Sequence, residues 1–137
     1  MAPLIFTRAI LNKEPIQIFN NRDMYRGFNY IDDIIEILFR LLNKPATPNI
    51  NFKKDKPDPS ITWSPCQLFN IGNGNKVDLM HFVELIETEL KMKAIKEFKP
   101  IQKGDIKSSS ADTEKIESYV NFKPNSPIEF GIKKFIN

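Results

Sequence analysis

The sequence has few of the residues that build disulfide frameworks, metal centres and membrane spans. The single cysteine, Cys66, excludes an internal disulfide and fits a reducing compartment. With His81 as the one histidine, the chain offers too few of the preferred ligands for a dedicated zinc site. No apolar run reaches the roughly 20 residues of a membrane span, and the first residues lack the basic and then apolar pattern of a signal peptide. We therefore expect a cytoplasmic protein with neither a metal nor a membrane as partner.

The sequence also lacks an excess of one charge. Its 137 residues have a net charge of +3, and acidic and basic residues are interleaved almost everywhere. The densest basic cluster, residues 53–56, stands among prolines, which is typical of a solvated loop rather than a nucleic-acid patch. A basic nucleic-acid-binding protein remains an alternative without a supporting motif, and we expect no nucleic acid as partner.

The hydrophobic pattern predicts one α/β domain over residues 1–137. Helical spacing indicates helices at 3–12, 32–43, 78–91, 112–119 and 128–136. Extended runs indicate strands at 16–19, 25–30, 67–71 and 94–99. The first two runs flank a polar turn, which predicts a hairpin. Asp78, and either Asp32 or Asp33, are expected to cap helices. Residues 44–66 contain five prolines and form a long loop of a kind that is usually functional or particular to a family.

Two patterns resemble catalytic or cofactor motifs without completing them. Gly72-x-Gly74 is half of a dinucleotide fingerprint, but Val77 stands where the third glycine belongs, so a turn with positive φ is the better interpretation. Tyr119 and Lys123 have the spacing of a catalytic pair, but the proline at 124 directs Lys123 away from helical geometry. We therefore expect no catalytic residue and no cofactor site in this chain.

Arg26 is the strongest candidate for ligand binding. It lies in a short aromatic strand, where its planar, permanently charged guanidinium can face a phosphate. The alternative is a weak surface salt bridge. Three other residues favour a ligand: Phe19 offers a flat face to a base, Asn70 precedes a glycine turn, and the carboxylate of Asp105 can accept hydrogen bonds from sugar hydroxyls. Together they predict a nucleotide site.

Five segments in order carry a resemblance to a known family. They are residues 15–20, 26–33, 69–73, 104–112 and 122–132. On these segments the chain resembles the C-terminal part of an extended short-chain dehydrogenase/reductase, of the NAD-dependent nucleotide-sugar epimerase and dehydratase family. Its loop at residues 43–48 and 56–59 is similar to that of bacterial UDP-glucuronate 4-epimerases.

The resemblance implies roles for five side chains. Arg26 matches the arginine that contacts the substrate diphosphate, and Phe19 lies at or near the base pocket. Asp105 matches a residue that contacts the ribose, and Gln102 stands where several relatives carry a ribose-contacting arginine. Asn70 matches an asparagine near the phosphates. The substrate class implied is a UDP-sugar used in polysaccharide precursor synthesis. The chain departs from the family's pattern at Gly27, where relatives usually carry an aspartate.

The resemblance also implies what this chain does not contain. In the complete enzymes an N-terminal Rossmann domain binds NAD and carries the catalytic Ser/Thr, Tyr and Lys. The chain begins and ends within predicted helices, which we interpret as the sign of a fragment. We expect it to be inactive alone, to expose apolar surface, to self-associate, and to need a separate N-terminal half. A non-catalytic UDP-sugar-binding module and a truncated remnant are the alternatives.

Overall fold

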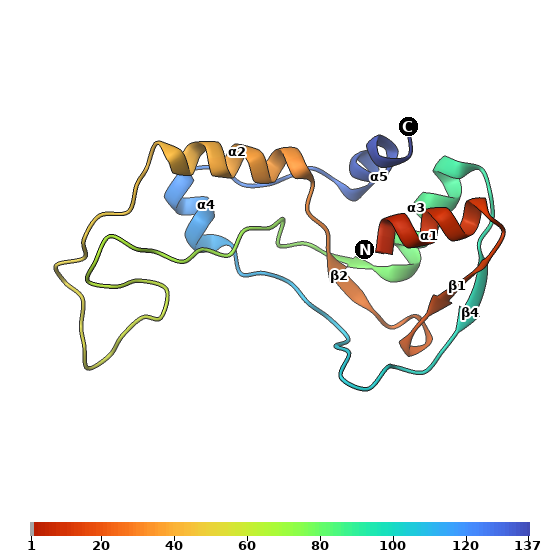
Figure 1. The fold of residues 1–137 in the computed structure, drawn as a ribbon, viewed down its shortest axis with the longest axis horizontal. Coiled ribbons are helices and arrows are strands. Elements are labelled where there is room, and N and C mark those ends of the chain that lie inside the picture. Colours follow the sequence, from red (N-terminus) through yellow and green to blue (C-terminus); the bar gives the residue numbers. More distant parts are fainter. Residues whose placement is uncertain (1) are drawn as a thin grey trace.

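The computed structural model describes residues 2–137, and the chain forms an elongated molecule of helices and short strands (Figure 1). The predicted α/β class is confirmed. The helices are α1 (Ala2–Leu11), α2 (Ile31–Leu42), α3 (Leu79–Leu90), α4 (Glu114–Val120) and α5 (Ile128–Ile136). The strands are β1 (Pro15–Ile18), β2 (Tyr25–Gly27), β3 (Lys76–Asp78) and β4 (Ile95–Phe98), with a short 3₁₀ turn, η1 (Asn20–Arg22), after β1. None of the helices within residues 2–137 combines the length and apolar character needed to cross a bilayer.

The strands form two separate pairs, and the predicted hairpin is wrong. Strand β1 pairs in parallel with β4, and β2 pairs antiparallel with β3. Asn20 and Arg22 of η1 both have φ in the left-handed region, so the chain changes direction after β1. Strand β2 therefore leaves the first sheet and finds its partner about 50 residues further along the chain.

Two apolar cores hold the elements together. In the first, helices α1, α3 and α5 pack around the β1–β4 pair, and the ring of Phe28 stacks on Phe82 at 4.6 Å. In the second, α2 packs against α4 around Ile37, Ile116 and Val120. Strand β2 and the loop after β4 connect the two regions (Figure 1).

A polar joint lies between the two cores. The buried Asn73 donates two hydrogen bonds across this joint. Its backbone N–H donates to Asn29 Oδ1 (2.9 Å), and its Nδ2 donates to the Ser126 carbonyl (3.0 Å). Gly72 permits this approach, since a Cβ there would lie 3.2 Å from the same Asn29 oxygen. The positive φ expected in this turn is found at Gly74.

The two predicted helix caps have different outcomes. Asp78 caps α3 as expected, because its Oδ1 accepts hydrogen bonds from the backbone N–H groups of Met80 and His81. Helix α2 is instead preceded by Tyr30 and has no side-chain cap. Asp32 and Asp33 lie in its first turn, where their negative charges suit the helix dipole. The carboxylate of Asp33 is used for a tertiary contact, accepting from the Ser126 N–H at 3.1 Å.

The predicted strand at 67–71 is not part of a sheet. Gln67 forms an isolated bridge with Ile61, and the Leu68 N–H donates to the Ser60 carbonyl. Beyond these contacts the segment runs without a partner strand. Its alternation is nevertheless that of a strand, because the side chains of Phe69 and Ile71 pack on the second core while Leu68 is exposed.

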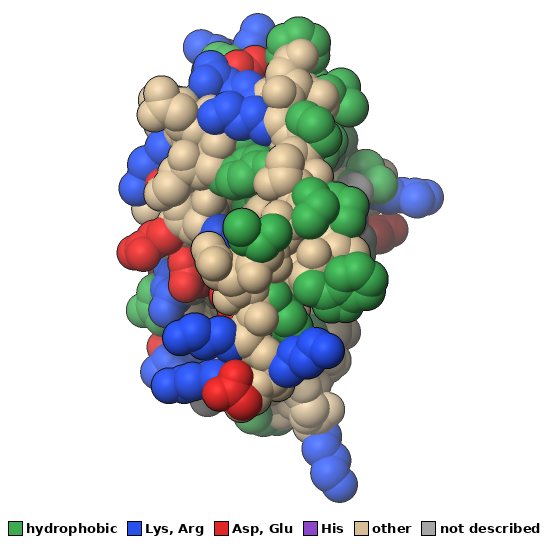
Figure 2. Space-filling view, turned by 90° about the vertical axis from the view of Figure 1, so that its left-hand side faces the viewer, with side chains coloured by type: hydrophobic (Ala, Val, Ile, Leu, Met, Phe, Trp, Pro, Cys, Tyr) green, Lys and Arg blue, Asp and Glu red, His purple; other side chains and the backbone are tan. Residues whose placement is uncertain are grey.

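The long loop at residues 44–66 projects from one end of the molecule (Figure 1). Figure 2 views that end and shows hydrophobic side chains gathered along one side of it, with lysine and arginine side chains elsewhere. Trp63 and Cys66 are both exposed in this loop.

Candidate functional site

The structure brings Arg26 of β2 into contact with Asp105 of the loop that follows β4. The Nη2 atom of Arg26 lies 2.9 Å from Oδ1 of Asp105. Backbone hydrogen bonds hold the loop along the outer edge of β2, since the Tyr25 N–H donates to the Lys107 carbonyl (2.9 Å) and the Ser109 N–H donates to the Tyr25 carbonyl (3.4 Å). The loop thus runs beside β2 like a short extra strand, and this fixes where the carboxylate lies.

Hydrogen bonds orient the guanidinium of Arg26, but they do not use all of its N–H donors. Its Nη1 donates to the carbonyls of Tyr25 (2.9 Å) and Lys107 (3.3 Å), and its Nη2 donates to Asp105. An arginine has five N–H donors. Within the described residues, the Nε–H and one Nη2–H of Arg26 have no recorded acceptor. The Arg26 side chain is 31% exposed to solvent.

Asp105 is positioned by a tight turn. Its backbone N–H donates to the Gln102 carbonyl at 3.0 Å, and Gly104 supplies the positive φ of 90° that such a turn requires at its third residue. The Oδ1 atom accepts from Arg26 and from the Ile106 N–H (2.8 Å). Among the described residues no donor is recorded for Oδ2, so this oxygen remains available as an acceptor for hydroxyl groups.

The surroundings of the pair are cationic. Lys107 lies 2.5 Å from Asp23, and the hydrogen bond and charge of that carboxylate raise the pKa of the Lys107 amine above its usual value. The guanidinium of Arg22 stacks on the ring of Phe98 at 4.7 Å. Lys107 therefore remains charged at neutral pH in the loop that carries Asp105, while Arg22 lies in η1, shortly before β2.

Arg26 has orienting partners even though its neighbour at position 27 is a glycine. The two carbonyls and the Asp105 carboxylate hold the guanidinium in place. A Cβ at position 27 would make ordinary contacts, at 3.7 Å from the Asn75 carbonyl oxygen. The structure therefore has room for a larger residue at 27, and the orientation of Arg26 does not depend on one.

Comparison with curated proteins finds relatives that match the whole length of the chain. No family model matches the chain. The protein CapI of Staphylococcus aureus is 39% identical over all 137 residues, which cover 41% of that protein. A probable UDP-glucuronate 4-epimerase of Rhizobium meliloti is 34% identical, and the match covers 99% of this chain and 40% of the relative. The chain thus spans about two fifths of the length of these curated relatives.

Solved structures show the same fold. A UDP-glucose 4-epimerase from Thermotoga maritima, with UDP-glucose bound, superposes with a TM-score of 0.73 at 23% identity, over 99% of this chain and 38% of the other. A UDP-glucuronic acid 4-epimerase from Bacillus cereus, in complex with NAD, gives 0.70 at 22% identity, again over 99% and 38%. The chain therefore has the same fold as the matching parts of these two epimerase structures, and its sequence is similar to the curated relatives over its whole length.

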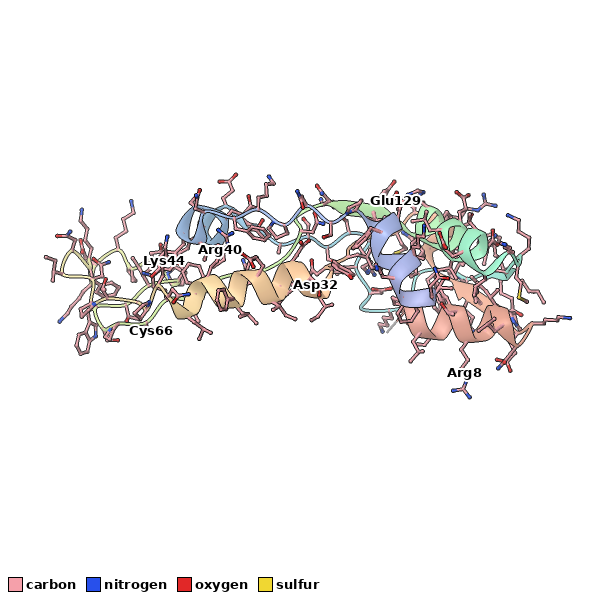
Figure 3. The ribbon with its side chains drawn as sticks, turned by 90° about the horizontal axis from the view of Figure 1, so that it is seen from above. Arg8, Asp32, Arg40, Lys44, Cys66 and Glu129 are labelled. Atoms are coloured by element: carbon pink, nitrogen blue, oxygen red, sulfur yellow. The ribbon has the colours of Figure 1, made fainter. Side chains whose placement is uncertain are left out.

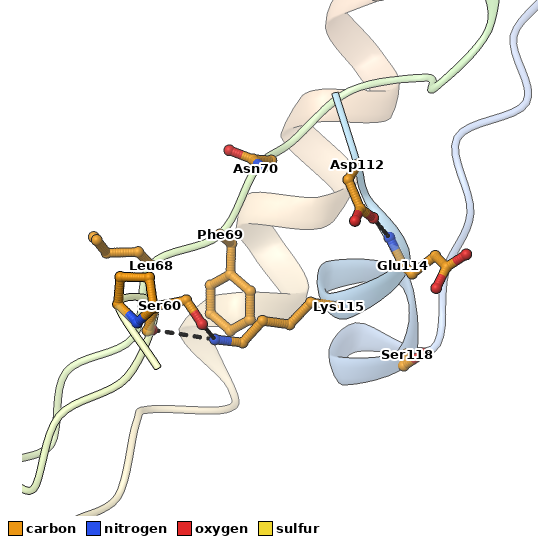
Figure 4. Close-up of a pocket in the computed structure, with 9 residues that line it drawn as sticks. Ser60, Leu68, Phe69, Asn70, Asp112, Glu114, Lys115 and Ser118 are labelled. Atoms are coloured by element: carbon orange, nitrogen blue, oxygen red, sulfur yellow. Dashed lines mark hydrogen bonds between the residues drawn. The ribbon is translucent and has the colours of Figure 1, made fainter. Parts of the chain in front are cut away.

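The other predicted site residues lie in different parts of the structure. Phe19 is half-buried directly after β1, and Gln102 is exposed at the start of the turn before Asp105. Asn70 is exposed and lines two adjoining hollows, one of about 420 Å³ that includes Gly27 and one of about 700 Å³ (Figure 4). In the described part of the chain no hydrogen bond joins Arg26 to Phe19, Asn70 or Gln102, and their shared role stays a prediction.

The larger hollow contains a contact that the sequence does not reveal. Lys115 of α4 donates to the Ser60 Oγ (2.6 Å), and its amine lies 5.1 Å from the centre of the Phe69 ring (Figure 4). Lysine and serine are 55 residues apart and neither belongs to a recognisable motif. Only the tertiary structure could have revealed the pair.

Three residues with reactive side chains are used in structural contacts. The Tyr119 hydroxyl donates to the Lys44 carbonyl (3.0 Å), and Lys123 lies beyond the end of α4, 3.5 Å from a carboxylate oxygen of Glu117. Within the described residues, no contact between Tyr119 and Lys123 is recorded. His81 of α3 lies 3.0 Å from Glu129 on α5. A partner so distant in sequence was not visible in the local pattern.

Proposed function

We propose that this chain binds the nucleotide of a UDP-sugar, as the C-terminal portion of an NAD-dependent nucleotide-sugar 4-epimerase that resembles the UDP-glucuronate 4-epimerases. The observation that carries the proposal is the contact between Arg26 and Asp105. Among the described residues it leaves two N–H donors and one carboxylate oxygen without partners. The relatives support it, because a probable UDP-glucuronate 4-epimerase matches the chain from end to end.

The proposed contacts follow from the free groups of the pair. The Nε–H and Nη2–H of Arg26 would donate to the diphosphate, where charge-assisted hydrogen bonds are stronger than neutral ones. The Oδ2 of Asp105 would accept from a ribose hydroxyl. By the family resemblance, Phe19 would line the base pocket, Gln102 would lie near the ribose and Asn70 near the phosphates.

The residues of this chain do not fit NAD. Gly72 and Gly74 lead into strand β3, whereas a dinucleotide turn opens a helix whose N-terminus holds the pyrophosphate. NAD, which supplies hydride chemistry to enzymes that bind it, would have to be held by another domain. We therefore propose that this chain alone binds the substrate nucleotide without converting it.

Isothermal titration with UDP, and separately with NAD, tests the proposal. We expect UDP to bind and NAD not to bind. Replacing Arg26 with alanine should weaken UDP binding by about 2–3 kcal/mol, the size of a lost hydrogen-bonded contact to a charged group. Arg8 provides the matched control, because it points away from α1 into solvent (Figure 3) and Arg8→Ala should leave the affinity unchanged.

The remaining outcomes separate the alternatives. UDP binding with no turnover, even when an N-terminal half is supplied, would indicate a non-catalytic module. No binding of either ligand would indicate a remnant and contradict the proposal. Salt-dependent binding to random DNA would support the nucleic-acid alternative, and we expect none.

A further inference from the structure

The loop that carries Asp105 has few contacts with the rest of the protein. It leaves β4 where the Lys99 N–H donates to the Ile18 carbonyl at 2.8 Å. Over residues 100–108 only Asp105 is half-buried, and the other residues are exposed. Exposed segments with few packing contacts open locally at a low cost in free energy. The position of the Asp105 carboxylate therefore depends on the small number of residues that attach this loop to β2.

Lys107 makes several of these attachments. Its backbone carbonyl accepts hydrogen bonds from the Tyr25 N–H (2.9 Å) and from Nη1 of Arg26 (3.3 Å). Its amine lies 2.5 Å from a carboxylate oxygen of Asp23. Because two residues of chain span at most about 7 Å, holding Lys107 in place also keeps Asp105 close to β2.

Asp23 belongs to a well-anchored part of the backbone. Its N–H donates to the Asn20 carbonyl (2.9 Å), and its own carbonyl accepts from Nδ2 of Asn20 (2.8 Å). The next residue, Met24, is buried, and its carbonyl accepts from the Leu79 N–H at 3.0 Å. The turn η1 and helix α3 therefore hold the carboxylate to which Lys107 is attached.

The ion pair between Lys107 and Asp23 has a local effect rather than a global one. The two side chains are 60% and 50% exposed, and ion pairs this exposed add little to the stability of a whole protein. The Lys107 amine nevertheless has a carboxylate partner, whereas the Nε–H of Arg26 has no recorded acceptor among the described residues. Lys107 is thus committed to a contact within the protein, and Arg26 is not.

We propose that the ion pair between Lys107 and Asp23 positions the Asp105 carboxylate for the ligand, and that neither Lys107 nor Asp23 touches the ligand. This inference rests on the proposed function and adds two positioning residues to the nucleotide site. Lys107 acts through Asp105 on the ribose hydroxyls. Binding of the diphosphate does not require the pair, because Arg26 keeps its contact with the Tyr25 carbonyl (2.9 Å). The competing role for Lys107 is direct contact with the diphosphate as a second cation.

Amide hydrogen exchange tests the attachment of the loop without any ligand. The N–H groups of Tyr25 and Ser109 report on it, because their hydrogen bonds join the loop to β2. We expect Lys107→Met to speed their exchange by about three- to fivefold, the most that an exposed ion pair can supply. Asp23→Asn should have the same effect.

Two further variants complete the exchange experiment. Lys103→Met is the matched control, because Lys103 is an exposed lysine of the same loop for which the described residues record no ion pair. It should leave both rates unchanged. The charge-exchanged variant, Asp23→Lys with Lys107→Glu, should restore protection. Unchanged exchange in Lys107→Met would overturn the proposal, and so would a charge-exchanged variant that exchanges as fast as Lys107→Met.

Titration with two ligands separates positioning from direct contact. UDP has the ribose hydroxyls that Asp105 would bind, whereas 2′,3′-dideoxyuridine diphosphate lacks them and keeps the diphosphate. Lys107→Met should weaken UDP binding by about three- to fivefold and leave the binding of the dideoxy compound unchanged. Equal weakening of both ligands would make Lys107 a diphosphate ligand and overturn the proposal, as would an unchanged affinity for UDP. A wild-type chain that binds neither compound would contradict the proposed function itself, and the exchange rates would still decide whether the pair holds the loop in place.

Discussion

Arg26 and Asp105 show how two residues 79 positions apart come into contact. Strand β2 and the turn at Gly104 each have a local sequence signal, but their contact does not. The chemistry of the arginine and the carboxylate predicted one nucleotide site, and the family resemblance added the diphosphate and the ribose as their partners. The contact between Lys115 and Ser60 had neither a local signal nor a resemblance, and sequence reasoning missed it.

Glu87 is a buried carboxylate that two lysines and a backbone N–H hold in its charged form. Burial alone would raise its pKa, but hydrogen bonds from Lys96, the Ala94 N–H and Lys93 outweigh it and hold the pKa at about 2. Because the folded pKa lies below the unfolded value of 4.5, this stabilisation is complete above pH 4.5 and is lost as the pH falls toward 2.

Glu87→Gln should therefore lower the free energy of unfolding at pH 7 by about 2–3 kcal/mol. The difference from the wild type should shrink as the pH falls from 4.5 toward 2. Urea unfolding at several pH values measures this, with Glu84→Gln, an exposed position on the same helix, as control. A difference that does not change with pH would contradict the assigned charge role.

At the level of elements, local sequence patterns predict the position of a helix or strand well where its formation depends on its own residues. Helices α1, α3 and α5 and strand β4 lie within one or two residues of their predicted bounds. The predicted strand pairing is wrong, because the hairpin prediction assumed that strands adjacent in sequence pair with each other. In the structure β1 pairs with β4, about 80 residues later. The segment 67–71 has strand alternation without a partner, and periodicity cannot reveal whether a partner is present.

The cap of α3 gives a prediction at this scale. Asp78→Ala removes the acceptor of two backbone N–H groups and should destabilise the protein by about 1 kcal/mol. Thermal unfolding followed by circular dichroism measures the loss. Asp32→Ala is a useful comparison, because Asp32 caps nothing and should cost less. Equal losses in both variants would contradict the assignment of Asp78 as the cap.

For the whole molecule, the polar joint at Asn73 connects the two apolar cores. Asn73→Ala removes the amide that donates to the Ser126 carbonyl and leaves that acceptor without its partner, at a cost of about 1–3 kcal/mol. We expect a lower urea midpoint and a larger radius of gyration by small-angle scattering. Asn125→Ala, an exposed neighbour of Ser126, should change neither. Loss of stability with an unchanged radius would show that the joint does not control the arrangement of the cores.

The central claim is that Arg26 binds the diphosphate of a UDP-sugar through donors the protein leaves free. The chain has four arginines, so their Nε–H signals can be followed individually by NMR while UDP is added. The account predicts a saturable shift of the Arg26 signal, with those of Arg8 and Arg40 unmoved. Saturable UDP binding with the Arg26 signal unmoved would contradict it.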